Sequence, residues 1–412
     1  MTEVGNVRLS MRLEPTIPTS SPGAGALLRL IRDGQASTRA ELVALTGLAR
    51  STVAQRMDAL LAQRLVVPAG GSVSTGGRPP QMFVFNRDAG VVLAADLGAT
   101  HSRLAVTDLG GEVLVEGAEE IAIAEGPEVV LSWLERALDG LLDEVGRNHD
   151  DVRGVGVGVP GPVEFATGTP VAPPIMPGWD GYRVSDRLAD HFGAPTLVDN
   201  DVNIMALGEH WKAWRAYDHL LYVKVGTGIG CGVITDGRIH RGAQGAAGDI
   251  GHIHVPGNLE ICRCGNRGCL EAVAGGGAMA ARLRAQGIEA ENSRDVVRQV
   301  RDGRPEAMQL VRQAGRELGE VLAASVNFFN PGVIVIGGDI AHADEHLLAG
   351  VREVVYQRAV PLGTRSLRIV RSALDDRAGV IGAAVMVIEH VLAPDVVDRM
   401  LATASAAAAA AE

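Results

Sequence analysis

The first ninety residues carry three groups of apolar residues with helical spacing. The run Leu27–Ile31 predicts a first helix. Thr38 and Glu41 have the spacing of a capping box and predict the start of a second helix, which Gly47 ends. A third helix is predicted by apolar residues at i, i+4, i+7 and i+8, namely Val53, Met57, Leu60 and Leu61. Two short helices joined by a glycine-containing turn are typical of a helix-turn-helix.

The apolar stripe of the third helix, which we expect to begin at Ser51 or Thr52, leaves polar side chains facing outward near its N-terminal end. They are Arg50, Ser51, Thr52, Gln55 and Arg56. That end of a recognition helix meets base edges and phosphates in the major groove. Leu65–Val67 and Met82–Phe85 predict a hairpin, or wing, around Gly70–Pro80, and we expect Arg78 at its tip to enter a minor groove. A winged helix that binds another protein is the alternative.

Downstream of this head, buried strands end in glycine turns. Val91–Thr100 predicts a strand running into a tight turn, where Gly98 lets backbone amides approach a phosphate and Thr100 adds a hydroxyl. Asp96 would then orient a magnesium ion. A matching strand, Leu220–Val225, leads into a second turn that contains Gly226, Thr227, Gly228 and Gly230. Either turn alone can be purely structural, but together they predict two similar lobes that hold one nucleotide, ATP with magnesium.

Two further strands end in candidate site residues. The strand from Thr196 ends in polar groups, and Asp201 is placed there to accept a proton from a substrate hydroxyl during phosphoryl transfer. A helix N-cap is the alternative role for Asp201. Gly337 and Gly338 follow an apolar strand and are candidate backbone surfaces beside the adenine or ribose, with ordinary strand-to-loop glycines as the alternative.

Three cysteines and one histidine have the composition of a metal site. The cysteines lie within eight residues and are Cys262, Cys264 and Cys269. With His252 upstream they form a closed Cys₃His set, which is typical of structural zinc. His254 is the competing fourth ligand. The isolated Cys231 is expected to be a small buried residue.

Composition and charge separate the head from the rest of the chain. The 412 residues are 47% apolar and 21% charged, which suits two or three folded domains and excludes a disordered chain. Residues 1–90 hold ten arginines, no lysine and six acids, a net charge of +4, whereas the whole chain has −11. A basic head on an acidic body favours DNA binding by the head alone. No uninterrupted apolar run approaches membrane-spanning length and no signal pattern is present, so we expect a cytoplasmic protein with no membrane partner.

Together these motifs resemble the ROK family (repressor, open reading frame, kinase), in its regulator branch with an N-terminal winged helix. The matching motifs are Asp96–Thr100, Val159–Pro162, Val198–Asp201, Gly226–Gly230, Gly248–His252, Cys262–Glu271 and Gly337–Gly338. The resemblance implies an α/β two-lobed actin-like (ribonuclease H-like) sugar kinase fold behind an α+β winged helix-turn-helix domain, in a homodimer or tetramer. It makes Asp201 the catalytic base. It also implies sugar contacts from Asn200, Asp201, Asp249, His252 and Glu271, with His252 ligating zinc through its other ring nitrogen.

Three positions depart from the family pattern. Ala99 stands where a second glycine is usual, and Asp249 stands where a glutamate is usual. Pro174–Pro177 lacks an asparagine that often contacts the sugar. These changes affect sugar selection more than the predicted base.

The sequence therefore predicts a flexible arm over 1–22, a winged helix-turn-helix domain over 23–88, a kinase-like domain over 89–401 and an alanine-rich tail over 402–412. The expected function is a sugar-responsive transcriptional regulator, a repressor, that binds operator DNA through its head and senses a sugar effector in a kinase-like cleft. An ATP-dependent hexose kinase with Asp201 as base is the main alternative. A protein-interaction adaptor is a third reading.

Overall fold

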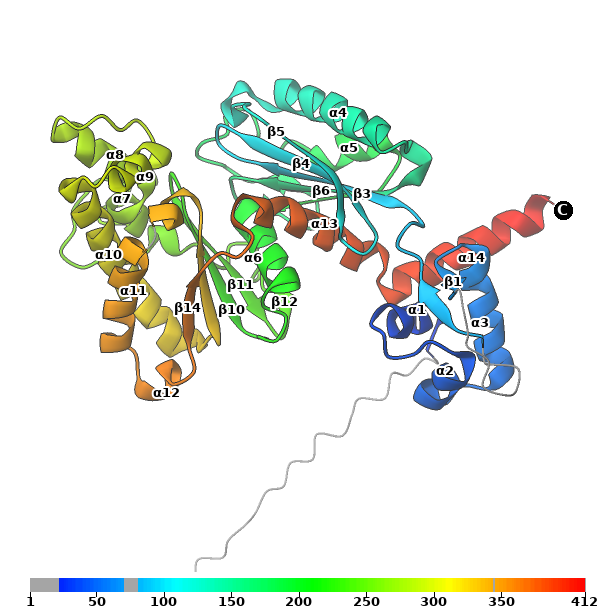
Figure 1. Cartoon of the computed structure of the whole chain (residues 1–412). Helices are drawn as coiled ribbons and strands as arrows, with labels where there is room; N and C mark the ends of the chain where they lie inside the picture. The colour runs from blue at the N-terminus through cyan, green and yellow to red at the C-terminus, as the bar shows by residue number, and fades with distance from the viewer. Residues whose placement is uncertain (1–21, 70–80, 344, 412) are drawn as a thin grey trace, which may run out of the picture. The chain divides into compact units, whose positions relative to one another are not determined.

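The computed structural model describes residues 22–69, 81–343 and 345–411, which divide into two compact units (Figure 1). The first unit, the head, joins the chain up to Asn86 with the segment from Leu392 onward. The second unit, the body, comprises Arg87–Val391.

Three helices and a two-stranded sheet form the N-terminal part of the head, in the predicted order. The helices are α1 (Ala24–Arg32), α2 (Arg39–Thr46) and α3 (Arg50–Ala62), and the antiparallel strands are β1 (Val66–Pro68) and β2 (Phe83–Phe85). The helix α3 begins at Arg50, slightly before the predicted start. The predicted wing tip, with Arg78, lies outside the described residues, as does nearly all of the predicted arm.

Local sequence explains the helix boundaries in the head. The Thr38 hydroxyl accepts a hydrogen bond from the Glu41 amide, and the Glu41 carboxylate accepts one from the Thr38 amide, which confirms the capping box. Gly47 ends α2 in the left-handed conformation, with φ of 69°. Val53 and Met57 of α3 are completely buried. The predicted apolar stripe therefore faces the core of the head.

The last helix, α14 (Pro394–Ala411), belongs to the head and packs against α1. This corrects two predicted boundaries, since the kinase-like unit ends at Val391 and the residues expected to form a separate tail continue α14. Asp398 Oδ1 accepts a hydrogen bond from the Gly25 amide at 2.9 Å. The prediction failed because α14 gains its partner from residues more than 370 positions earlier in the chain.

The first lobe of the body contains a five-stranded mixed sheet in the order β5-β4-β3-β6-β9. Its strands are β3 (Val91–Leu97), β4 (Ser102–Asp108), β5 (Val113–Glu119), β6 (Val152–Val159) and β9 (Thr196–Asn200). Every residue of β3 is buried, as its apolar run predicts. Helices α4 (Pro127–Glu144) and α5 (Val184–Phe192) cover one face of the sheet (Figure 1).

The second lobe repeats this arrangement with a sheet in the order β12-β11-β10-β13-β14. Its strands are β10 (Leu220–Val225), β11 (Ile229–Thr235), β12 (Arg238–Ile239), β13 (Val333–Gly337) and β14 (Arg368–Arg371). The helices α7 (Leu270–Ala274), α8 (Gly276–Ala285), α9 (Ser293–Arg301), α10 (Pro305–Phe329) and α11 (Glu345–Arg358) belong to the same lobe. In both sheets an antiparallel hairpin is followed by parallel strands, so the predicted two-lobed α/β fold is confirmed.

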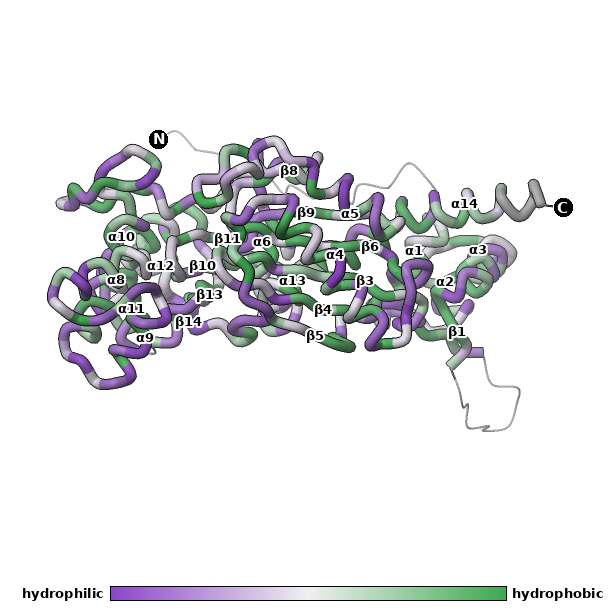
Figure 2. The backbone as a smooth tube through the Cα atoms, turned by 90° about the horizontal axis from the view of Figure 1, so that it is seen from above, coloured by the Kyte–Doolittle hydropathy of each residue, from purple (hydrophilic) through white to green (hydrophobic). Residues whose placement is uncertain are grey.

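Two helices, α6 (Asp201–Lys212) and α13 (Ala378–Val391), pack against each other between the two sheets (Figure 1). Glycines let their backbones meet: a Cβ atom built on Gly382 would lie 1.6 Å from the Ile204 carbonyl oxygen. The part of α13 from Ala378 to Ile388 is entirely buried. The strands that flank this helix pair are coloured mainly as hydrophobic in Figure 2, which marks the interior of the body.

No single helix among the described residues is long and apolar enough to cross a membrane. One bent pair, Asp375–Val391 with Pro394–Ala406, passes that test by length and composition alone.

Candidate functional site

The end of β9 and the start of α6 position the predicted base. Asn200 is the N-cap of α6, because its side-chain oxygen accepts a hydrogen bond from the Val202 amide at 3.0 Å. Its side-chain nitrogen donates to the Gly161 carbonyl at 2.8 Å. The capping role considered for Asp201 therefore falls to Asn200. Asp201 is the first residue of the helix, and its carboxylate makes a different contact.

That contact is an ion pair with Lys224, whose Nζ lies 2.5 Å from Asp201 Oδ2. Lys224 lies on β10, two residues before the Gly226 turn. Burial opposes its charge, but the carboxylates of Asp201 and Asp96 outweigh burial and hold its pKa above the usual value. No role for Lys224 was predicted from the sequence. The available signal was its rarity, since it is one of only two lysines in the chain.

Asp96 lies at the end of β3 and is buried. Burial, with a smaller contribution from Asp201, raises its pKa to about 7, although Lys224 opposes this shift. Its Oδ1 has no hydrogen-bond partner among the residues that the structure describes. Its other oxygen lies against the start of α13, where a Cβ atom on Gly379 would approach it to 1.9 Å. A buried carboxylate oxygen without a donor suits the predicted magnesium ion.

The turn after β3 carries the first predicted phosphate contacts. A Cβ atom on Gly98 would lie 2.5 Å from the His101 carbonyl oxygen, so the hairpin itself requires this glycine. Thr100 is exposed at the tip of the turn. The contacts of Gly98 thus support a purely structural role for this glycine in the turn. A contact between this turn and a phosphate stays a prediction.

The turn after β10 is held from the other side by α8. The amides of Gly276 and Gly277 donate to the carbonyls of Gly226 and Thr227 at 2.8 and 3.0 Å. Thr227 is exposed, whereas Gly230, predicted to lie in the turn, already belongs to β11 and packs toward α6. This turn is therefore fixed at its base while its tip faces solvent.

Three glycines, one in this turn and two at the end of β13, permit close packing. A Cβ atom on Gly228 would lie 2.1 Å from Glu271 Oε2, and one on Gly337 would lie 2.0 Å from the Tyr222 hydroxyl. Gly338 has a φ of 82° and lies against the backbone of β10. Close packing alone therefore explains why glycine stands at these three positions, and it does so without any contact to a nucleotide.

The four predicted zinc ligands come together. Cys262 Sγ lies 3.6 Å from His252 Nδ1, Cys264 Sγ lies 3.7 Å from Cys269 Sγ, and all four ligand atoms lie within 4.8 Å of one another. A tetrahedral zinc ion would separate such atoms by roughly 3.5–3.8 Å, so this donor set fits Zn²⁺. The group contains His252 and excludes the competing His254.

The fourth cysteine has a different environment. Cys231 is buried, and burial raises the pKa of its thiol to about 12. It therefore behaves as the small core residue that was predicted.

Glu271 connects the cysteine loop to the glycine turn. It lies in the first turn of α7, two residues after Cys269, and its Oε2 accepts a hydrogen bond from the Ile229 amide at 3.2 Å. Asp249, in contrast, is exposed just before the short 3₁₀ helix η3 (Ile250–His252). The structure thus places Glu271 between the cysteine loop and the glycine turn.

A buried ion pair next to the predicted base was missed from the sequence. Asp199 is buried and accepts hydrogen bonds from Asn203 Nδ2 and Arg241 Nε, each at 2.8 Å. The Arg241 guanidinium also lies over the Phe165 ring, 3.5 Å from its centroid. Asp199 belongs to the Val198–Asp201 motif, but its partner Arg241 lies 42 residues further along the chain.

The predicted DNA-contacting residues in the described part of the head lie in the first two turns of α3. Arg50, Ser51 and Gln55 are exposed, whereas Thr52 and Arg56 are half-buried. The Arg56 guanidinium donates a hydrogen bond to the Pro22 carbonyl. The first three residues therefore form the accessible part of the predicted contact set.

Some known proteins are similar to nearly the whole chain, and others are similar to about three quarters of it. A putative xylose repressor of Caldicellulosiruptor sp. (strain Rt8B.4) is 34% identical over 386 residues, covering 90% of this chain and 96% of the relative. A glucokinase of Thermotoga maritima is 30% identical over 315 residues, covering 73% of this chain and 98% of that enzyme. The solved structure of a ROK family transcriptional regulator, a homologue of the E. coli MLC protein, matches with a TM-score of 0.79 and 26% identity, covering 92% of this chain and 97% of that one.

The family assignment rests on the body as a whole. Residues 92–390, which include both lobes, the candidate base and the cysteine loop, match the ROK family. The resemblance predicted from the sequence motifs is therefore confirmed, and this chain belongs to the ROK family.

Proposed function

We propose that this protein is a sugar-responsive transcriptional repressor that binds operator DNA through its head and a sugar effector through its body. The observation that carries the proposal is the extent of the two kinds of match. The repressor-like relative matches 90% of the chain, head included, whereas the glucokinase covers 73%. The head is thus the part shared with a repressor and absent from the enzyme.

The charge and exposure of the head support DNA binding. Residues 1–90 carry a net charge of +4 in a chain whose overall charge is −11. Arg50, Ser51 and Gln55 are exposed at the N-terminal end of α3, where a recognition helix presents side chains to the major groove. A homodimer would present two such helices to the two halves of an operator.

In the body, the predicted sugar-contacting residues include residues at the starts of helices. Asn200 and Asp201 lie at the start of α6, and Glu271 lies at the start of α7. His252 directs Nδ1 toward the cysteine sulfurs, so a structural zinc ion would leave Nε2 for a sugar hydroxyl. Zinc would thereby fix the orientation of a sugar-contacting imidazole.

The helix α13 gives the body a covalent route to the head. It begins beside Asp96 and ends at Val391, immediately before the segment that belongs to the head. A sugar that binds one arrangement of the two lobes more tightly than another would favour that arrangement and so shift the position of α13. The affinity for DNA would then change by an amount set by the difference between the sugar's affinities for the two arrangements.

The direct test has two steps. The full-length protein is first used to select DNA duplexes from a random pool. Its binding to the selected duplexes is then measured by fluorescence anisotropy at several salt concentrations. We expect sequence-selective binding that weakens steeply with salt and changes when one sugar from a panel of pentoses, hexoses and hexosamines is added. The double variant Arg50→Ala/Gln55→Ala should lose selectivity while keeping sugar binding. Absence of selective DNA binding with every sugar would overturn the proposal.

A kinase activity is the second candidate, and one observation favours it. Asp96 has a buried carboxylate oxygen with no described hydrogen-bond partner, which would accommodate a magnesium ion bound with ATP. Asp201 would then accept the sugar hydroxyl proton, but one of its oxygens is already paired with Lys224 and would have to be released for that role. Sugar-dependent ADP release that disappears in Asp201→Asn would establish the enzyme.

A further inference from the structure

A cluster of two histidines and one aspartate lies in the first lobe and shares no residue with the candidate site described above. Asp139 belongs to α4, His149 begins the 3₁₀ helix η2 (His149–Asp151), and His191 lies in the last turn of α5. His149 Nε2 is 2.9 Å from Asp139 Oδ1, and His191 Nε2 is 3.0 Å from Asp139 Oδ2. One carboxylate therefore receives both imidazoles, from three separate segments of the chain.

We propose that Asp139, His149 and His191 bind a divalent transition-metal ion, with Zn²⁺ as the probe that tests the site. One ligand atom from each side chain lies within 4.8 Å of the other two. Two imidazole nitrogens and one carboxylate oxygen form a donor set that suits zinc, copper and nickel. Because ligand atoms around a tetrahedral ion are roughly 3.3 Å apart, the observed contacts need to open by only a few tenths of an ångström.

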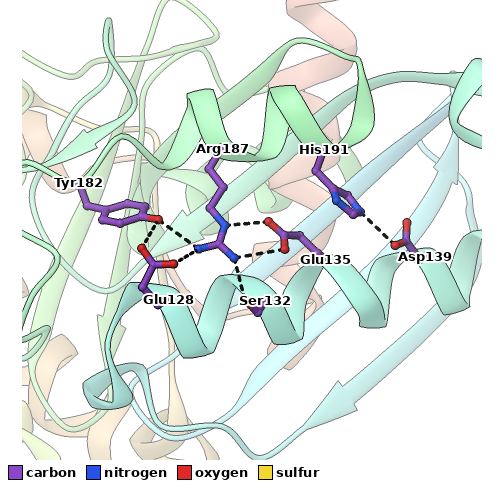
Figure 3. Close-up of polar contacts among 7 residues, drawn as sticks. All are labelled: Glu128, Ser132, Glu135, Asp139, Tyr182, Arg187 and His191. Atoms are coloured by element: carbon purple, nitrogen blue, oxygen red, sulfur yellow. Dashed lines mark hydrogen bonds and ion pairs between the residues drawn. The ribbon is translucent and has the colours of Figure 1, made fainter.

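The two helices that carry the site are already held together one turn away (Figure 3). Arg187, four residues before His191, places Nε 2.8 Å from an oxygen of Glu135, which precedes Asp139 by four residues. The same guanidinium donates to Ser132 Oγ at 2.7 Å. These contacts fix α5 against α4, so His191 meets Asp139 without help from a metal. Such preorganisation lowers the entropy lost when an ion binds.

A core side chain also fixes the imidazole rings. Phe192 is buried, and its ring centroid lies 4.6 Å from that of His191 and 5.3 Å from that of His149. The His191 ring meets Phe192 edge-on, at 82°. Both imidazoles therefore rest on a rigid surface while their Nε2 atoms face the carboxylate.

The surroundings are accessible and acidic. The side chains of His149, Asp139 and His191 are 44%, 36% and 32% exposed, so an ion can enter from solvent and retain water ligands. Hollows of about 460 and 390 Å³ flank the cluster, and their lining includes Asp143, Asp150 and Asp190. The nearby Arg153 directs its guanidinium to the Ala89 carbonyl, at 2.7 Å. The local charge thus favours a cation.

The test counts zinc ions on the full-length, metal-stripped protein by equilibrium dialysis at a fixed excess of free Zn²⁺, with metal measured by mass spectrometry. His191→Ala should bind one equivalent fewer than the wild-type chain, and Asp139→Ala should lose the same equivalent. The control His390→Ala changes an exposed histidine of α13 and should bind as many ions as the wild type. All three substitutions are at the surface or partly exposed, so the fold should survive, which circular dichroism checks.

Cobalt separates this site from the cysteine site. Co²⁺ bound by thiolates gives an intense charge-transfer band, whereas the histidine–aspartate site should add only weak d–d absorption. We expect the weak component to disappear in His149→Ala and the charge-transfer band to disappear in Cys269→Ser. An unchanged number of bound ions in both His149→Ala and His191→Ala would overturn the proposal. This inference does not rest on the function proposed for the cleft.

Discussion

Among single residues, the main feature of the candidate site is the Lys224 ammonium group, which faces Asp201, the predicted base. Lys224 lies 2.5 Å from Asp201, and Asp96 contributes to the charge that holds Lys224 protonated. The ammonium is paired with Asp201 alone and also interacts electrostatically with Asp96, so it supplies positive charge beside both carboxylates, as a magnesium ion would in a kinase. Under the function proposed above, this pair suits a site that senses a sugar better than a site that turns it over.

The variant Lys224→Met tests this interpretation. Removing the ammonium frees Asp201, so Mg²⁺ affinity should rise by about tenfold or more, and sugar-dependent ADP release should appear or increase. The matched control is Lys212→Met, which removes the only other lysine, paired with Glu112 near the surface. Lys224→Met/Asp201→Asn should lose the gain. If Lys224→Met alters neither magnesium binding nor turnover, the ion pair does not restrain the site.

The cysteine cluster gives a second prediction at this scale. Cys262→Ser removes one thiolate, so zinc should be lost, the melting temperature of the body should fall by several degrees, and sugar binding should weaken by about 10–100-fold as His252 loses its orientation. Calorimetry and sugar titration measure both effects. Cys231→Ala, at the buried cysteine outside the cluster, should retain zinc and sugar binding. Sugar affinity that survives removal of zinc would show that His252 is oriented without the ion.

At the scale of elements, the helix pair α6 and α13 determines how the two lobes meet. The approach of α13 to α6 depends on Gly382, which faces the Ile204 carbonyl, and on Gly208, which faces that of Ala378. No side chain separates the backbones at these points. Because α6 carries Asp201 and α13 begins beside Asp96, this crossing also sets the distance between the two carboxylates.

Gly382→Ala should therefore be strongly destabilising. Its Cβ atom would lie 1.6 Å from a backbone oxygen, so one helix must move, at a cost of roughly 1–3 kcal/mol or more. The control is Gly140→Ala in α4, where no atom lies within 4 Å of the new Cβ and alanine should stabilise the helix by about 0.5–1 kcal/mol. Urea unfolding of both variants measures the difference. Equal stabilities would mean that the crossing adjusts without strain.

At the scale of the whole molecule, the chain passes between head and body twice, at residues 86–87 and 391–392. The N-cap of α1 is Gly23, which offers no side-chain hydrogen bond, and Asp398 of α14 supplies the missing acceptor to the Gly25 amide. The C-terminal segment thus completes the head. Any movement of α13 that reaches α14 would act directly on the domain that carries the predicted DNA-contacting residues.

Asp398→Ala should consequently weaken the head and leave the body unchanged. The loss of the cap should cost about 1 kcal/mol, seen as faster hydrogen exchange in α1 and weaker DNA binding. Asp395→Ala is the control, because Asp395 lies on the same helix but only in an exposed pair with Arg399. Equal exchange in the two variants would contradict the capping role. Sugar binding should not change in either.

Features that depend on residues close together in the chain could be predicted from the amino-acid sequence. Periodicity predicted the helices of the head and both glycine hairpins, and the spacing of Thr38 and Glu41 predicted a capping box that the structure contains. The candidate zinc ligands could be predicted because His252 and the three cysteines span fewer than twenty residues. The departure of Asp249 from the family pattern is visible in the sequence itself. In each case the residues that interact lie within one or two turns, one hairpin or one loop.

Contacts between residues far apart in the chain could be identified only from the folded structure. Lys224 reaches Asp201 across 23 positions, and Gly25 reaches Asp398 across 373. Neither partner is marked by local periodicity, because an isolated lysine or aspartate is compatible with any exposed position on a helix or strand. Their roles depend on how sheets and helices stack, which brings together groups that the chain keeps apart. For that reason the sequence predicted the elements and chemical groups of this protein, while the pairing of its base, the glycine crossing and the attachment of its last helix required the fold.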